Sequence, residues 1–335
     1  MIFVLLLVLN FILLRNFNYI SNNINIYDTP DNKLKLHKKK MPLLGGVIFF
    51  FNLFTVLFYQ FLSKGNFLAF QFNFFNLTQK IAIILLILFF FLLGLIDDKL
   101  NLSPYKKIFY SIFFLSIGIF FNNNLIIDKI SLSFYQNKIF FDNLSIFFTI
   151  FCVVILINAL NFYDGINGQS CFFFLIIFIY LFLKSNFNQF YLICIFVLVF
   201  ILYLNLSEHL FIGDSGIFIL GSLTSVSFIL EHNINNNIYY ADEIFLLLIL
   251  PGIDLLRLFI TRLLKGNNPF YGDRSHIHHL LIKKFKLITS NVILLCLAVF
   301  PVILYFFLNF YFSFFIFITF YFSLVLFLSL NILKR

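Results

Sequence analysis

The sequence predicts an all-α polytopic integral membrane protein with about eleven transmembrane helices. Of its residues, 62% are hydrophobic and only 11% are charged. Apolar runs of roughly 18 or more residues, long enough to cross a bilayer as a helix, recur from end to end. Strands of a transmembrane barrel would alternate apolar and polar residues instead, so the pattern argues against a barrel.

The predicted spans follow the apolar runs, and no break in composition divides them, so we expect a single membrane-embedded domain over residues 1–335. The first run has no basic segment before it and no small-residue cleavage site, which favours a span over a signal peptide. The spans lie at about 2–20, 44–63, 80–97, 107–121, 143–160, 170–184, 190–206, 217–231, 243–263, 291–309 and 312–331.

The loops between these spans alternate sides, and Lys and Arg are concentrated on one side. By the positive-inside rule that side is cytoplasmic, with the N-terminus outside and the C-terminus inside. This bias and anionic lipids or substrates account for the +9 formal charge without a nucleic-acid partner. The predicted cytoplasmic loops cover about 28–43, 98–106, 161–169, 207–216 and 264–290.

Most aspartates and histidines fall in these cytoplasmic loops and the adjoining helix ends. An Asp at the centre of a span costs about 2.5–3.5 kcal/mol, so such residues need a reason. A transporter keeps its polar site near the bilayer midplane, where this chain offers little beyond Asp254 and Arg257, whose i, i+3 spacing indicates a structural pair. Polar chemistry gathered at one face fits an enzyme that joins a cytosolic substrate to a membrane lipid.

Three motifs carry carboxylates or amides in these loops. In "GLIDDKLNLSPYKK", Asp97 and Asp98 oppose the dipole at a helix C-terminus, so a cation or a proton would relieve them; the alternative is a solvated helix end. "NALNFYDGING" offers directed hydrogen bonds, or forms an ordinary turn. In "FIGDSG", Asp214 either caps its own helix or serves Mg²⁺ beside a phosphate-binding helix N-terminus.

The fourth motif, "PFYGDRSHIHH", places three histidines behind an Asp-Arg pair. On a helix His276 and His279 would share one face and His278 would point elsewhere, so the three would not converge on one ion. Zinc and a solvated loop remain alternatives. We favour recognition of an anion and a sugar by Arg274, His276 and His279, with Asp273 orienting them.

Together with "DTP…H…MPLLGG", these stretches occur in the order typical of the polyprenyl-phosphate N-acetylhexosamine-1-phosphate transferases, glycosyltransferase family 4, and span residues 28–279. The chain resembles this family, and "PFYGDRSHIHH" resembles the branch that uses simple UDP-N-acetylhexosamine (UDP-HexNAc) donors. The resemblance implies transfer of HexNAc-1-phosphate, most simply GlcNAc-1-phosphate, from a UDP-sugar to undecaprenyl or another polyprenyl phosphate with release of UMP. It also implies a bacterial cytoplasmic (inner) membrane location, a site facing the cytoplasm, contact with membrane lipids and a homodimer.

The resemblance further implies Mg²⁺, with Mn²⁺ as the alternative ion, and assigns roles to individual residues. Asn167 departs from the family pattern, which often has Asp there, and Asn205 stands one residue closer to Asp214 than in the family. The implied roles are metal binding for Asp214, catalysis for Asp97 and Asp98, and substrate binding for Asn161, Asp164, Asn167, Phe211, Asp273, Arg274, His276, His278, His279, Lys107 and His37.

Two other classes stay open from the sequence. A transporter or lipid flippase of similar topology would move its substrate without releasing UMP. A former enzyme acting as a membrane scaffold would not need the full set of aspartates that this chain retains.

Overall fold

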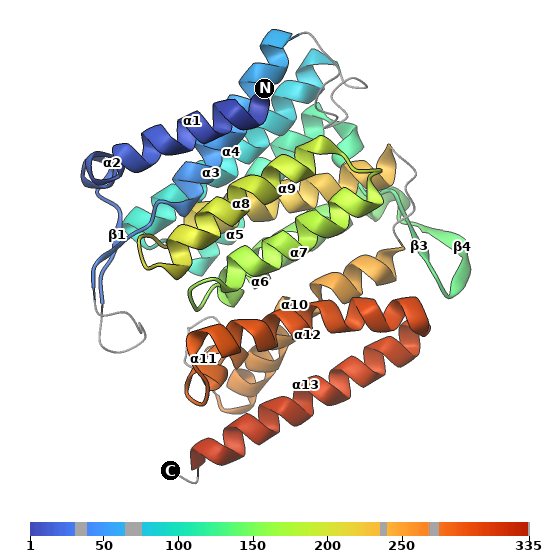
Figure 1. Ribbon diagram of the computed structural model, residues 1–335. Coiled ribbons are helices and arrows are strands. Elements are labelled where there is room, and N and C mark those ends of the chain that lie inside the picture. Colours follow the sequence, from blue (N-terminus) through green and yellow to red (C-terminus); the bar gives the residue numbers. More distant parts are fainter. Residues whose placement is uncertain (31–38, 64–75, 235–239, 267, 269–274, 334–335) are drawn as a thin grey trace.

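The computed structural model describes the chain apart from residues 31–38, 64–75, 235–239, 267, 269–274 and 334–335. It is a bundle of helices with two short antiparallel strand pairs (Figure 1). The helices are α1 (Ile2–Arg15), α2 (Phe17–Ile24), α3 (Gly45–Ser63), α4 (Leu77–Leu100), α5 (Pro104–Phe121), α6 (Ser145–Tyr163), α7 (Gln169–Lys184), α8 (Gln189–Leu206), α9 (Gly213–Asn233), α10 (Ala241–Leu264), α11 (Ile277–Ile282), α12 (Leu287–Phe307) and α13 (Phe310–Leu333).

The strand pairs lie in two of the connections. In the first, β1 (Tyr27–Asp28) pairs with β2 (Met41–Pro42), with Tyr27 opposite Pro42. In the second, β3 (Lys129–Leu132) and β4 (Tyr135–Phe140) form a hairpin with Lys129 opposite Phe140. The hairpin projects beyond the ends of the helices (Figure 1).

A polytopic helical membrane protein is confirmed, because every apolar run predicted to span coincides with a helix. Within the described residues, eight helices are long and apolar enough to cross a membrane, and α1 with α2 make a ninth if the bent pair counts as one span. The remaining two, α7 and the part of α3 from Gly45 to Tyr59, are apolar but shorter.

The first predicted span, 2–20, is not one straight helix. It bends by 68° between α1 and α2. Asn16 stands at the break and donates its side-chain N–H to the Ile12 carbonyl, which satisfies an acceptor at the end of α1. Beyond the break α2 is rich in asparagine, so its composition no longer suits the bilayer interior.

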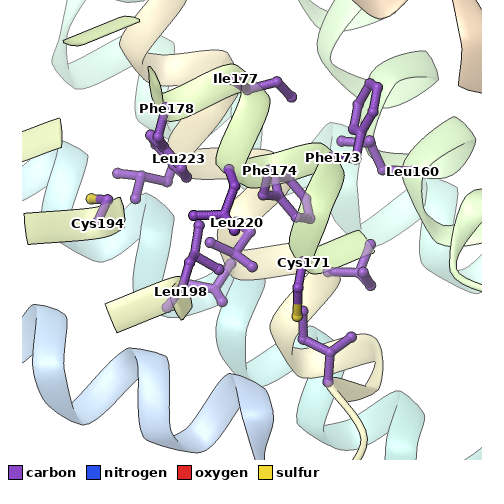
Figure 2. Close-up of a cluster of buried hydrophobic side chains, with 14 of the residues drawn as sticks. Leu160, Cys171, Phe173, Phe174, Ile177, Phe178, Cys194, Leu198, Leu220 and Leu223 are labelled. Atoms are coloured by element: carbon purple, nitrogen blue, oxygen red, sulfur yellow. The ribbon is translucent and has the colours of Figure 1, made fainter. Parts of the chain in front are cut away.

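Helix α9 occupies the centre of the bundle. Other parts of the chain bury 94% of its 18-residue apolar stretch. It packs against α3, α4, α6 and α7. Figure 2 shows Leu220 and Leu223 of α9 among side chains of the neighbouring helices, including Phe174 and Phe178 of α7 and Leu198 of α8.

Two glycines allow α3 and α4 to cross the first turn of α9 at very short range. A Cβ added to Gly46 would lie 2.3 Å from the Gly216 nitrogen, and one added to Gly94 would lie 2.4 Å from the Ser215 Cα. Small residues at such crossings permit close backbone packing between membrane helices. The crossing brings the ends of α3 and α4 to the start of α9.

The two predicted sets of loops meet at opposite ends of the bundle. At one end the Phe211 carbonyl accepts from the Gly45 N–H, and the Asn205 side chain bridges the Gly168 N–H and the Leu210 carbonyl. At the other end the Asn233 amide donates to the carbonyls of Asn124 and Ile126. The chain therefore gathers its predicted cytoplasmic motifs at a single end.

Candidate active site

Three aspartates and one lysine from α4, α5 and α9 form the first cluster of this site. Asp97 and Asp98 lie in the last turn of α4, and Asp214 lies in the first turn of α9. Asn101 adopts a left-handed conformation (φ 49°, ψ 68°) that ends α4, and Pro104 then starts α5. This short turn brings Lys107 back over the carboxylates, while Lys106 stays exposed.

The Lys107 ammonium contacts two of these carboxylates. It forms ion pairs with Asp97 Oδ2 and with Asp214 Oδ2, the second at 3.4 Å. The other oxygen of Asp97 accepts the Leu102 N–H at 2.8 Å. Two carboxylates from separate helices are thus drawn to one cation position, because neither could be desolvated beside the other without positive charge.

Asp98 has a different partner from its neighbour. Its carboxylate accepts the backbone N–H groups of Asp214 at 2.7 Å and of Ser215 at 3.0 Å. Asp98 therefore caps α9 from another helix, and α9 has no side-chain cap of its own. The alternative in which Asp214 caps its own helix is wrong, and its carboxylate contacts Lys107 instead.

The donor set at this cluster fits a magnesium ion. Mg²⁺ prefers one or two carboxylates together with substrate phosphate oxygens. Asp97 and Asp214 offer such oxygens around a position that already attracts a cation. Both Asp98 oxygens are engaged by backbone N–H groups, which makes Asp98 the less available ligand.

The last turn of α6 and the loop between α6 and α7 carry the predicted amides and Asp164. Asp164 Oδ1 accepts the Ser170 hydroxyl at 2.7 Å. Burial raises the pKa of Asp164 to about 6, and the hydrogen bond from Ser170 opposes that rise. The Asn167 carbonyl accepts from the Asn291 side chain of α12, while the side chains of Asn161 and Asn167 are partly accessible.

The histidine motif lies against this loop, but not as predicted. His276 precedes α11 with extended backbone (φ −60°, ψ 150°), so it does not share a helix face with His279. Its ring stacks on that of His278 at 5.2 Å and on Phe162 of α6 at 6.2 Å. The prediction that His278 points away from His276 is therefore wrong. It assumed that both lie on one helix, whereas α11 begins at Ile277 and His276 lies before it.

His278 is the histidine that docks on the α6–α7 loop. Its Nδ1 lies 3.4 Å from the Gln169 amide nitrogen, and a Cβ at Gly165 would lie 1.8 Å from its Nε2. Gly165 is thus required by the close approach of the imidazole. Burial, followed by the nearby His279 and His276, holds the pKa of His278 well below its usual range, so the ring is neutral at pH 7.

A buried group of side chains on α10 and α13 contacts the histidines. It was not among the site residues predicted from the sequence. Asp254 Oδ2 lies 2.8 Å from His276 Nδ1, and its Oδ1 accepts from Arg257 at 2.8 Å and from the Tyr321 hydroxyl at 2.7 Å. The predicted Asp254–Arg257 pair is confirmed. The rarity of Asp inside a span is the signal that could have flagged Asp254, whereas nothing in the sequence distinguishes Tyr321.

The ligand atoms of Asp254, His276 and His278 lie within 4.8 Å of one another, which is compatible with a metal ion. Arg257 argues against one, since its guanidinium already neutralises the same carboxylate and would repel a divalent cation. Structural zinc sites, moreover, usually include cysteine, and the four cysteines of this chain are free and lie apart from the cluster.

The predicted site residues therefore fall into groups. Asp97, Asp98, Lys107 and Asp214 come together, and Asp164 shares its loop with the docking surface of His278. Phe211 lies just before α9, and its backbone forms hydrogen bonds with Pro42 of β2 and Gly45 of α3. His37, Asp273 and Arg274 lie outside the described residues.

Sequence comparison links this helix bundle and its polar cluster to a family of glycosyltransferases. Residues 80–232, which include all four residues of the Asp97–Asp214 cluster, match a sequence model of glycosyl transferase family 4. The family resemblance predicted from the motifs is confirmed.

Three relatives carry the name of a specific kind of transferase. The chain is 26% identical over 314 residues to the undecaprenyl-phosphate alpha-N-acetylglucosaminyl 1-phosphate transferase of Thermotoga maritima, covering 92% of this chain and 90% of that protein. It is 26% identical over 273 residues to the transferase of the same name from Yersinia pestis, covering 78% and 70%. It is 25% identical to a probable undecaprenyl-phosphate N-acetylglucosaminyl 1-phosphate transferase of Bacillus subtilis, covering 78% and 71%.

Proposed function

We propose that this protein transfers N-acetylglucosamine 1-phosphate from UDP-GlcNAc to undecaprenyl phosphate, releases UMP and so starts a lipid-linked surface glycan. The observation that carries the proposal is the convergence of Asp97, Lys107 and Asp214 from three helices at one end of a membrane bundle. The names of the relatives supply the acceptor lipid and the sugar.

The reaction is an exchange of one phosphoryl bond for another. An oxygen of the lipid phosphate attacks the phosphorus that carries the sugar, and the bond from that phosphorus to the bridging pyrophosphate oxygen breaks. UMP leaves with the bridging oxygen. The attacking phosphate is already an anion, so neither a protein nucleophile nor a covalent intermediate is needed, and positioning with charge neutralisation supplies most of the catalysis.

Asp97, Asp214 and Lys107 would carry the charge balance. Mg²⁺, or Mn²⁺ in its place, would supply a counter-charge for the pyrophosphate when held by Asp214 with Asp97. Lys107 would then turn from its two carboxylates toward a substrate phosphate, since its long side chain reaches both. Asp98 would hold the first turn of α9 in register through its two backbone hydrogen bonds.

The remaining predicted residues would bind the donor. Asn161, Asp164 and Asn167 would contact the uridine and Phe211 would stack on the uracil, because these residues surround the α6–α7 loop and the start of α9. The histidine segment would read the sugar and its phosphate. Asp273, Arg274 and His37 belong to the same proposal by resemblance.

The setting of the enzyme follows from the charge of its loops. We place the active end at the cytoplasmic face of the bacterial inner membrane, with the N-terminus outside, the C-terminus inside and a single domain over residues 1–335. A homodimer in contact with membrane lipids completes the proposal. No observation favours the transporter, since Asp254 and Arg257 contact the histidine segment.

The test is UMP release by purified protein in detergent with undecaprenyl phosphate, Mg²⁺ and a panel of UDP-HexNAc donors. UMP release that needs both substrates supports the transferase, and the donor that gives it identifies the sugar. Asp214→Asn should abolish turnover, whereas Asp128→Asn, an exposed Asp at the opposite end, should keep it. Wild-type protein that binds both substrates yet releases no UMP would overturn the proposal.

A further inference from the structure

The proposed function leaves Asp254, Arg257 and Tyr321 without a role. They sit within the helices α10 and α13, and the carboxylate of Asp254 and the ring of Tyr321 are almost fully buried. Ionisable groups inside a membrane protein are costly and usually serve its function. Their partners show what they hold.

Both charged residues contact the short segment before α11. The Arg257 guanidinium donates to the Ser275 carbonyl at 2.7 Å. Asp254 Oδ2 lies 2.8 Å from His276 Nδ1, and Asp254 Oδ1 accepts the Ile277 N–H at 3.3 Å. Successive residues of the segment are therefore fixed by two side chains one turn apart on α10, and α11 is capped from another helix just as α9 is.

These contacts determine which nitrogen of His276 faces a substrate. A carboxylate accepts a hydrogen bond, so the proton of the imidazole is held on Nδ1 and Nε2 is left for another partner. Stacking on Phe162 and His278 fixes the plane of the ring. Phe162 stands two residues before Asp164, so the plane is set against the loop proposed to bind the donor.

Helix α13 completes the arrangement through Tyr321. Its hydroxyl donates to Asp254 Oδ1 at 2.7 Å and accepts from Arg257 Nε at 3.1 Å. Oδ1 is thus occupied by Tyr321 and Arg257, which leaves Oδ2 directed at His276. Helix α13 therefore helps to orient the Asp254 carboxylate, which contacts His276, a residue 22 positions later in the chain.

We propose that Asp254 is a positioning residue that holds His276 with its Nε2 presented to the phosphate or sugar of the bound donor, and that Arg257 and Tyr321 hold Asp254. This inference rests on the proposed function and assigns it residues on α10 and α13 that the motifs do not include.

The experiment compares Asp254→Asn, His276→Gln and the double variant by UMP release under saturating donor and lipid, with KM for each. An Asn side chain can present its NH₂ to Nδ1 and so place the ring proton on the wrong nitrogen. We expect kcat to fall roughly 10–100-fold in Asp254→Asn, the size of loss typical when the partner that orients a metal-ligating histidine is removed. We expect the double variant to be no slower than the slower single variant, because Asp254 acts through His276.

Asp128→Asn is the matched control, because it makes the same change at an exposed aspartate at the opposite end of the bundle, and it should keep wild-type kcat. Tyr321→Phe removes one hydrogen bond from the Asp254 carboxylate and leaves the His276 contact, so its loss of kcat should be smaller than that of Asp254→Asn, about threefold. Wild-type kcat in Asp254→Asn would overturn the proposal, as would losses that multiply in the double variant. One equivalent of tightly bound zinc in wild-type protein that is lost in Asp254→Asn would also overturn it.

Asp254→Glu covers the case in which Asp254→Asn does not fold. It keeps the charge that neutralises Arg257 but moves the carboxylate by one methylene, so kcat should fall while the protein remains monodisperse; unchanged kcat would contradict the proposal. Wild-type protein is measured in the same assay, so a failure of the proposed function appears as no UMP release at all and is separate from a failure of this inference.

Discussion

The carboxylate of Asp98 caps the helix on which Asp214 stands, with hydrogen bonds of 2.7 Å and 3.0 Å from the backbone N–H groups of Asp214 and Ser215. Adjacent aspartates in one motif therefore have different tasks. Asp97 contacts Lys107 at the cation position, whereas Asp98 holds the backbone of the helix turn that carries Asp214. A negative charge at a helix N-terminus also complements its dipole.

Asp98→Ala should lower the stability of the protein by about 0.5–2 kcal/mol, because it leaves two N–H groups of α9 without their acceptor. Asp98→Asn keeps one oxygen acceptor and should lose less. Asp97→Asn should abolish UMP release with a smaller effect on thermal unfolding. Unfolding in detergent, followed by intrinsic fluorescence, checks the order, and an Asp97→Asn protein less stable than Asp98→Ala would contradict it.

Gly46→Ala should disrupt folding, since its Cβ would lie 2.3 Å from the Gly216 nitrogen and neither backbone can move without opening the bundle. Gly252→Ala is the matched control in α10, where an added Cβ meets nothing within 4 Å. Replacing a helical Gly by Ala is itself favourable by about 1 kcal/mol, so this variant should be as stable as wild type or more so. Size-exclusion profiles and unfolding temperatures would separate the two, and equal behaviour would refute the tight crossing.

Binding of the donor should weaken as the pH falls through about 6, because the pKa of Asp164 is raised to about 6 and its carboxylate becomes protonated below that. KM for the UDP-sugar should rise between pH 7 and pH 5, and Asp164→Asn should remove this rise. For stability the sign is opposite: the folded-state pKa exceeds the ordinary value of 3.8, so the protonated form favours folding and that contribution is lost as the pH rises through 6. A donor KM independent of pH in wild type would count against the role of Asp164.

Asn10 of α1 and Asn52 of α3 exchange two side-chain hydrogen bonds, of 3.1 Å and 2.9 Å, in the buried interior. Asn52→Leu should destabilise the protein by about 1–3 kcal/mol, because Asn10 would lose its partner away from water. The double variant with Asn10→Leu should recover part of that loss, since no amide is left unpaired. Unfolding temperatures of the three variants test the coupling, and additive losses would argue against it.

The sequence predicts the elements of this fold well because the span signal is local. Each apolar run became a helix, and the motifs that carry Asp97, Asp164, Asp214 and His276 lie at one end as the alternation of loops requires. The bend at Asn16 was not predicted, since a polar residue near the end of an apolar run can equally extend the helix or break it.

Long-range pairing explains what the sequence does not reveal. The contacts of Asp98 with α9, 116 residues away, and of Tyr321 with Asp254, 67 residues away, depend on which helices become neighbours. Asn122 and Asn233 lie in asparagine-rich stretches whose composition suits solvent, yet Asn122 is buried and Asn233 ties the end of α9 to the connection after α5. The hydrophobic pattern is nearly uniform around most of these helices, so it does not specify their partners.

The enclosure of α9 has a consequence for how the protein is made. Residues such as Ser222, Thr224 and Ser227 face other helices, so α9 as a lone span would expose hydroxyls to lipid. The helices that contact it most, α3, α4, α6 and α7, all precede it in the chain and leave the ribosome first. Helix α9 can therefore enter a shell that is already in the bilayer. Afterwards α10 packs on α6, α12 packs on α7 and α13 packs on α12, which adds the residues that contact His276.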